Sequence, residues 1–160
     1  MKRFISVLLV ICTLAVTLSA CSGGKKIDKL SEAMLSKQSS TIKMVTVKSG
    51  DPDAEEAYNK AIDTFGIDNV DSFFISLAEN TRENADEILV LQLKSKKELD
   101  LALAAVSKHF GYNSASYMRT KPSEVPKFNN KSLFTYKNYV VLIVSDNSAE
   151  IEKAFYDTVD

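Results

Sequence analysis

Residue types that commonly carry out catalysis are scarce in this chain of 160 residues. It has one histidine, His109, two cysteines, Cys12 and Cys21, and no tryptophan. A Ser-His-Asp triad or a histidine-based metal site would need His109, and two cysteines cannot supply a four-cysteine zinc site or a disulfide framework. We expect His109 to have a structural role near the C-terminal end of a helix. We therefore predict no catalytic residues, no metal site and no cofactor.

Two acidic clusters lack the pattern of a known site. Residues 51–56 superficially resemble a calcium loop, but the sixth and twelfth positions hold Glu56 and Ile62, where an EF-hand requires Gly and Glu. Acids at the start of a helix are favoured by its dipole, which explains this cluster better. The second cluster comprises Glu79, Glu83, Asp86 and Glu87. A glycosidase uses two carboxylates across a cleft, but we interpret these four as a solvated turn.

Cys21 is the residue whose surroundings predict a definite chemistry. A basic start precedes an uncharged run at 4–18, which has the length of a signal-peptide core and is short for a membrane span. The motif Leu18-Ser19-Ala20-Cys21 then resembles the bacterial lipobox. We predict cleavage between Ala20 and Cys21 and a diacylglyceryl group on Cys21, which would hold the protein at the extracytoplasmic face of the cell membrane. The alternative is an ordinary signal peptide or an uncleaved anchor that happens to place a cysteine here.

Removal of residues 1–20 makes the chain more acidic. The full chain has 20 basic and 21 acidic residues, whereas the mature chain has 18 and 21, a formal charge of −3. Such a balance does not support nucleic-acid binding. The length allows one domain, and we divide the chain into a signal peptide at 1–20, a lipid-anchored tether and spacer at 21–50 and one domain at 51–160.

Hydrophobic periodicity predicts alternating strands and helices. Asp53, Ser95 and Asn147 each precede a helical pattern with Glu three residues on, as N-caps do, while Gly66 and Gly111 are expected to end two of the helices. The expected strands are 44–47, 73–77, 88–93, 133–136 and 139–144, and the expected helices are 27–37, 54–65, 95–110 and 147–159.

The fold class follows from the order of these elements. Residues 88–93 and 139–144 are apolar on both faces, which indicates central strands. Strand pairs separated by helices predict an α+β fold with a mainly antiparallel sheet and helices packed on one face. A shift of 52 residues places Ile88 on Val140 and Leu99 on Ile151, so the domain contains two ββα units. They arose by duplication, or they look alike because all tightly connected strands and helices do.

Several short motifs resemble a known family when taken in order. They are Ala85-Asp86-Glu87-Ile88, Asn138-Tyr139, Ser145-Asp146 and the segment 150–155. Over about residues 40–160 the chain is similar to Gram-positive-type lipoproteins that share a C-terminal domain of unknown function. Members often carry Gly before the Asn-Tyr pair, where this chain has Lys137. The resemblance implies a lipobox, and it implies no catalytic residues.

The segment 110–139 combines aromatic and basic residues. Its 20 residues from Gly111 to Asn130 would make a long loop, and such loops are often functional. Aromatic side chains interleaved with cations suit an anionic polymer or a partner peptide. Alternatively, the aromatic residues fold back over the sheet and the lysines are solvated. The candidate binding surface consists of Tyr112, Tyr117, Arg119, Lys121, Lys127 and Phe128.

These observations favour a non-enzymatic binding or interaction module at the cell envelope, whose partner is a protein or an envelope polymer. A second possibility is a small-molecule or peptide-binding accessory lipoprotein for transport or sensing. A deep apolar pocket beneath residues 111–131 would favour it. A third is a hydrolase that acts on the envelope, for which two facing carboxylates in a cleft would be the support.

Overall fold

The centre of the fold is a five-stranded antiparallel sheet with the strand order β1-β2-β3-β5-β4. The computed structural model describes residues 22–39 and 41–160, so the predicted signal peptide and Cys21 lie outside the described residues. The α+β class and the antiparallel sheet are confirmed. The strands are β1 (Met44–Lys48), β2 (Val70–Ala78), β3 (Glu87–Leu93), β4 (Ser132–Tyr136) and β5 (Tyr139–Val144).

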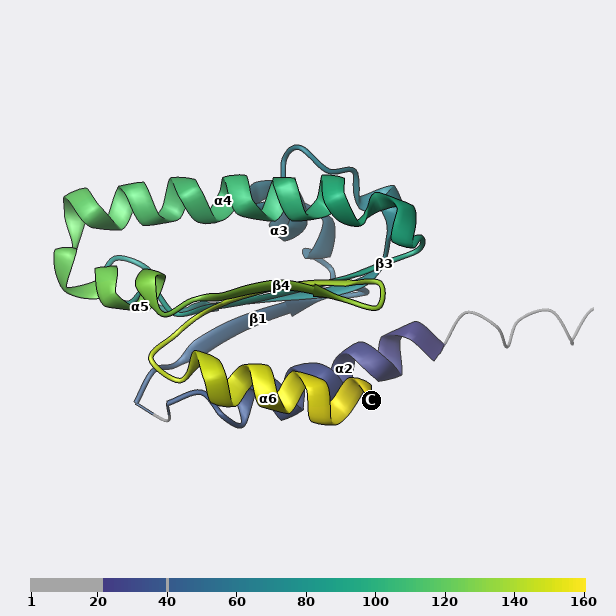
Figure 1. The fold of residues 1–160 in the computed structure, drawn as a ribbon, viewed down its shortest axis with the longest axis horizontal. Helices are drawn as coiled ribbons and strands as arrows, with labels where there is room; N and C mark the ends of the chain where they lie inside the picture. The colour runs from purple at the N-terminus through teal and green to yellow at the C-terminus, as the bar shows by residue number, and fades with distance from the viewer. Residues whose placement is uncertain (1–21, 40) are drawn as a thin grey trace, which may run out of the picture.

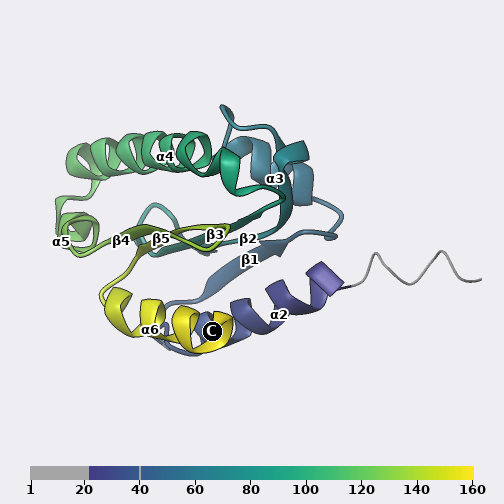
Figure 2. The ribbon, with the colours of Figure 1, turned by 45° about the vertical axis from the view of Figure 1, so that its right-hand side comes forward.

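Helices cover both faces of this sheet, so the expectation that they pack on one face is wrong. α3 and α4 lie on one side, and α2 and α6 lie on the other (Figures 1 and 2). The physical reason is already in the central strands, which are apolar on both faces and need cover on both. The helices are α2 (Ser22–Leu35), α3 (Ala54–Ala61), α4 (Leu99–Thr120), α5 (Val125–Asn129) and α6 (Ser148–Val159), with 3-10 turns at Ile67–Asn69, Lys96–Glu98 and Pro122–Glu124.

Alternation along the strands divides the core into two clusters. Side chains on one face of β2, β3 and β5 pack against α3 and α4, and those on the other face pack against α2 and α6. The first cluster includes Phe73, Leu89, Leu91, Leu142, Ala102 and Val106. The second includes Phe74, Ile88, Val90, Val141, Leu30 and Phe155.

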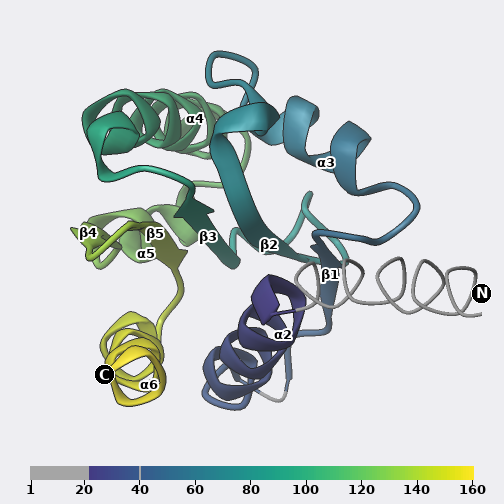
Figure 3. The ribbon, with the colours of Figure 1, turned by 90° about the vertical axis from the view of Figure 1, so that its right-hand side faces the viewer.

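The predicted spacer is part of the fold from Ser22 onward, which corrects the domain boundary at residue 51. α2 packs against α6 and β2 (Figure 3), and Ile27, Leu30 and Met34 are only 1%, 2% and 0% exposed. Their stripe is narrow, but it covers the part of this face that α6 leaves open. The residues expected to form a flexible tether are helical from Ser22 onward, which is where the described part of the chain starts.

Two of the predicted helix ends are wrong. α3 ends at Ala61, with Gly66 at an ordinary φ of −64°. Gly111 lies inside α4, which continues to Thr120. A glycine in a helix costs about 1 kcal/mol relative to alanine but does not require the helix to stop, so the expected loop at 111–130 is largely helical.

The predicted N-caps are correct only for Ser95, whose hydroxyl accepts a hydrogen bond from the Lys97 amide at 3.2 Å. In the described part of the chain, neither the Asp53 nor the Asn147 side chain caps its helix. The Asn147 amide instead donates to the Lys37 carbonyl at 3.1 Å, which connects α6 to the end of α2.

The two ββα units have opposite hands. In each unit an antiparallel strand pair leads into a helix, but α4 lies on one face of the sheet and α6 on the other. A rotation that superposes the strands β2 and β3 on β4 and β5 leaves the helices on opposite sides. Two copies of a duplicated unit would have the same handedness. The sequence similarity between the two units is therefore better explained by the general physics of strand-to-helix connections.

Candidate binding groove

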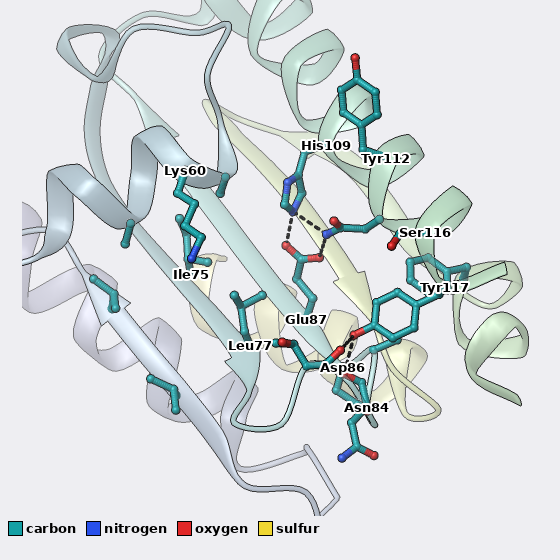
Figure 4. A pocket seen from close by; sticks show the side chains of 18 of the residues that line it. Lys60, Ile75, Leu77, Asn84, Asp86, Glu87, His109, Tyr112, Ser116 and Tyr117 are labelled. Atoms are coloured by element: carbon teal, nitrogen blue, oxygen red, sulfur yellow. Dashed lines mark hydrogen bonds and ion pairs between the residues drawn. The ribbon is translucent and has the colours of Figure 1, made fainter. Parts of the chain in front are cut away.

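A groove of about 590 Å³ lies between α3 and α4, above strands β1 and β2 (Figure 4). Val45 and Val47 of β1 and Ile75 and Leu77 of β2 form its apolar floor. It is open because α3 has only eight residues and leaves part of the sheet uncovered. Val45 is accordingly 49% exposed, although its side chain is on the core face of the strand.

Both helices contribute small and polar side chains to the walls of this groove. α3 supplies Ala57, Lys60 and Ala61, and α4 supplies a row of residues at helical spacing. Thr81 and Asn84, in the connection between β2 and β3, close one end. The row on α4 consists of His109, Tyr112, Asn113 and Ser116.

A buried polar cluster joins β3 to α4 inside the groove. Glu87, the first residue of β3, is bonded through Oε1 to Nε2 of His109 at 2.5 Å. Its Oε2 accepts a hydrogen bond from Nδ2 of Asn113 at 3.2 Å. The side chains of Glu87 and His109 are only 4% and 13% exposed. This burial corrects the interpretation of Glu87 as part of a solvated turn.

The protonated form of His109 is favoured in this cluster. Burial lowers the pKa of the imidazole, but the hydrogen bond and the charge of Glu87 raise it, with a further contribution from the Ala61 carbonyl. The net pKa lies above the ordinary value. Nε2 of His109 bonds Glu87, and the second ring nitrogen of a protonated imidazole is a further donor. His109 therefore connects α4 to β3.

A second buried charge cluster lies next to the groove and involves two residues assigned to other roles by sequence. Lys127 Nζ lies 2.5 Å from Asp86 Oδ2 and 2.7 Å from Glu124 Oε2. The side chain of Lys127 is 8% exposed, and that of Asp86 is 1% exposed. Burial lowers the pKa of Lys127, yet the bonds to the two carboxylates outweigh it and raise the pKa. Lys127 is therefore an internal counterion and not part of a binding surface, and Asp86 does not lie in a solvated turn.

Of the remaining candidate residues, the three aromatic ones line the groove, and Phe128 is also part of the core. Tyr112 is 66% exposed on the rim. The Tyr117 hydroxyl donates to the backbone carbonyls of Thr81 and Asn84, which fixes the turn at the end of the groove. Phe128 is 3% exposed and packs on Tyr117 with 5.3 Å between ring centroids.

The two other cations lie away from the groove. Lys121 forms an exposed ion pair with Glu83, and Arg119 lies exposed in the last turn of α4. The structure therefore does not bring the six candidates together as one surface. The aromatic residues fold back over the sheet in part, as the alternative interpretation stated.

The residues of α3 and β1 that form the groove were missed by sequence reasoning. From the sequence, Ala57 and Ala61 are expected on the apolar face of a helix, and Val45 and Val47 are expected in a strand. One signal was available for the polar cluster, because His109 and Asn113 are four residues apart, on one face of a helix. Glu87 directly precedes a strand that is apolar on both faces, where an acid needs a buried partner.

Comparisons with protein-family profiles, with curated proteins and with solved structures found no match. Within residues 22–39 and 41–160, no set of three His, Cys, Asp or Glu side chains is arranged to hold a metal ion. The helices of that same part are too short or too polar to cross a membrane.

Proposed function

We propose that this chain is a lipid-anchored extracytoplasmic lipoprotein that acts as a non-enzymatic binding module, with the groove between α3 and α4 as its binding site. The groove is the observation that supports the proposal. Its volume, its apolar floor and the few polar groups along its walls are typical of ligand-binding sites. This geometry favours the small-molecule or peptide-binding alternative over an interaction surface on residues 111–131.

The polar cluster in the groove supports binding over catalysis. A general base must lie within hydrogen-bond reach of its substrate. The side chains of Glu87 and His109 are only 4% and 13% exposed and are bonded to each other, and Glu87 also accepts from Asn113. The adjacent carboxylate of Asp86 is paired with Lys127. The three carboxylates among the described residues that line the groove are all paired, so this site does not support the third possibility, an envelope hydrolase.

The membrane attachment is proposed from the lipobox. A diacylglyceryl group on Cys21 would place α2, which starts at Ser22, directly at the membrane surface. Metabolic labelling with an alkyne-bearing palmitate tests this attachment: the wild-type chain is expected to be labelled and Cys21→Ser is not. Equal labelling of both would refute it. Membership of the Gram-positive-type lipoprotein family is likewise a proposal, supported by the motifs quoted above.

A groove-filling substitution tests the binding site itself. Ala57→Trp places an indole in the groove, and Ala104→Trp, at an exposed position of α4 that does not line this groove, is the matched control. Each full-length variant is reconstituted in nanodiscs, incubated with an envelope extract and washed, and the retained compounds are identified by mass spectrometry. We expect compounds that wild type and Ala104→Trp retain and Ala57→Trp loses. Identical sets for all three proteins, at equal melting temperature, would contradict the proposal.

A further inference from the structure

The charged side chains that line the groove are paired, with the exception of Lys60. Three ion pairs account for the others: Lys108 with Asp63 at 3.3 Å, His109 with Glu87 at 2.5 Å, and Lys127 with Asp86 at 2.5 Å. Lys60 has no ion-pair partner among the described residues, and Figure 4 shows its amine pointing from α3 into the groove, toward the strand that carries Ile75. The groove therefore has one uncompensated positive charge above an apolar floor.

The free edge of β1 borders the same floor. Amide–carbonyl bonds from Glu79 to Lys43 at 2.8 Å and from Ser49 to Phe73 at 3.0 Å show which residues of β1 face β2. In an antiparallel ladder, successive residues of a strand direct their backbone N–H and C=O groups alternately toward and away from a given neighbouring strand. The backbone groups of Val45 and Val47 thus also face β2, whereas those of Met44, Thr46 and Lys48 face outward.

Only part of this outer edge is open. The Lys48 amide donates to Asp51 Oδ2 at 2.7 Å, and the Lys48 carbonyl accepts from the Asp51 amide at 3.0 Å, so a turn closes that end. Met44 and Thr46 keep an outward N–H and C=O without a partner in the described chain. An extended segment that pairs with them would place the side chain opposite Val45 on the groove side of the sheet.

We propose that the groove binds an extended peptide that carries a carboxylate and adds to the sheet beside β1. This inference rests on the proposed function and names its ligand class. The peptide backbone would bond to Met44 and Thr46, as in other complexes in which a strand is added to a sheet edge. Its alternate apolar side chains would contact Val45 and Val47, and its carboxylate would pair with Lys60. The free edge, the apolar floor and the unpaired cation together distinguish a peptide from a simple alkyl anion, which would leave the edge unused.

A defined peptide library tests the inference. The probe consists of acetylated hexapeptides with valine, leucine or phenylalanine at alternate positions and serine between them, made with a free C-terminal carboxylate and as the amide. The library is passed over the full chain in nanodiscs and over empty nanodiscs. We expect specific retention of carboxylate members. Failure of every member to be retained would overturn the inference.

Two changes, one in the protein and one in the best retained peptide, test the ion pair and the strand pairing separately. Lys60→Gln is expected to weaken binding by about two- to fivefold, as for an exposed ion pair, while Lys29→Gln, at an exposed lysine on α2, leaves it unchanged. N-methylation of the peptide amides that face β1 should weaken binding about tenfold, and methylation of the other alternate set should not. Equal binding of all these forms would contradict pairing with the β1 edge.

Dodecanoate is included to separate this inference from the proposed function. If dodecanoate binds wild type and Ala104→Trp but not Ala57→Trp, while no peptide binds, the groove is a ligand site and the peptide inference is wrong. If neither probe distinguishes Ala57→Trp from wild type, the proposed function is contradicted as well.

Discussion

Replacing Lys127 by methionine should strongly destabilise the fold, because it removes the cation shared by two buried carboxylates. The side chains of Asp86 and Glu124 are 1% and 13% exposed. Breaking a buried ion pair by removing one partner costs about 3–5 kcal/mol. Asp86 keeps a hydrogen bond from Gln38 at 2.6 Å, and Glu124 keeps one from the Ala85 amide at 3.0 Å. We therefore expect a loss of about 3 kcal/mol, at the lower end of that range.

Urea unfolding of the full chain in nanodiscs, followed by circular dichroism, measures this loss. With an m value of about 1–3 kcal/mol/M, a loss of 3 kcal/mol lowers the midpoint by about 1–3 M. Lys121→Met is the matched control, because the Lys121–Glu83 pair is 34% and 57% exposed and such pairs contribute at most about 1 kcal/mol.

A second substitution tests the cause of the loss. In the Lys127→Met background, Asp86→Asn removes the unpaired charge and should recover part of the stability, because a neutral amide costs less to bury than a carboxylate. A loss below about 1 kcal/mol for Lys127→Met, or no recovery with Asp86→Asn, would refute the description of Lys127 as the counterion of a buried cluster.

Three further predictions concern the pH dependence, α2 and a hairpin. Because the pKa of His109 is raised in the folded state, its contribution is fully present below its unfolded pKa of about 6.5 and is lost as pH rises through the folded pKa. Unfolding measured from pH 5 to 9 should show this loss in wild type and not in His109→Gln; parallel curves would contradict it. Leu30→Ala should cost about 2–5 kcal/mol, as for other buried leucines, whereas no change in urea midpoint would mean that α2 is a tether after all. Lys137 has a φ of +53° at the first position of the β4–β5 hairpin, where glycine is favoured. Lys137→Gly and Lys137→Ala both remove the side-chain bonds to Val159 and Asp160, and the glycine variant should be more stable than the alanine variant by about 1 kcal/mol; equal melting temperatures of the two would show that the turn imposes no strain.

The strands were predictable because their signal is local. All five expected strands are present, with bounds that differ by at most a few residues. A run such as 139–144, apolar on both faces, has few alternatives to a central strand. The same observation required helices on both faces, but the weak stripe at Ile27, Leu30 and Met34 gave no indication of which helix would cover the second face.

The helix ends and the groove were not predictable in the same way. Gly111 resembles a helix stop, yet a helix ends at a glycine only where a left-handed residue is needed, and the partners of α4 favour its continuation to Thr120. The groove depends on how far apart α3 and α4 lie over β1, which no local pattern encodes. Lys127 and Lys121 look alike in sequence, and only the fold makes one an internal counterion and the other a surface residue.

Photo-crosslinking from the groove rim in living cells tests most directly whether the groove between α3 and α4 is the binding site. Benzoyl-phenylalanine replaces Tyr112 on the rim or Leu101 on the same helix, at positions that are 66% and 63% exposed. We predict a discrete adduct from position 112 that Ala57→Trp abolishes and Ala104→Trp preserves, and no such adduct from position 101. Equal adducts from both positions, or an adduct from 112 that Ala57→Trp leaves unchanged, would contradict the assignment of this groove as the binding site.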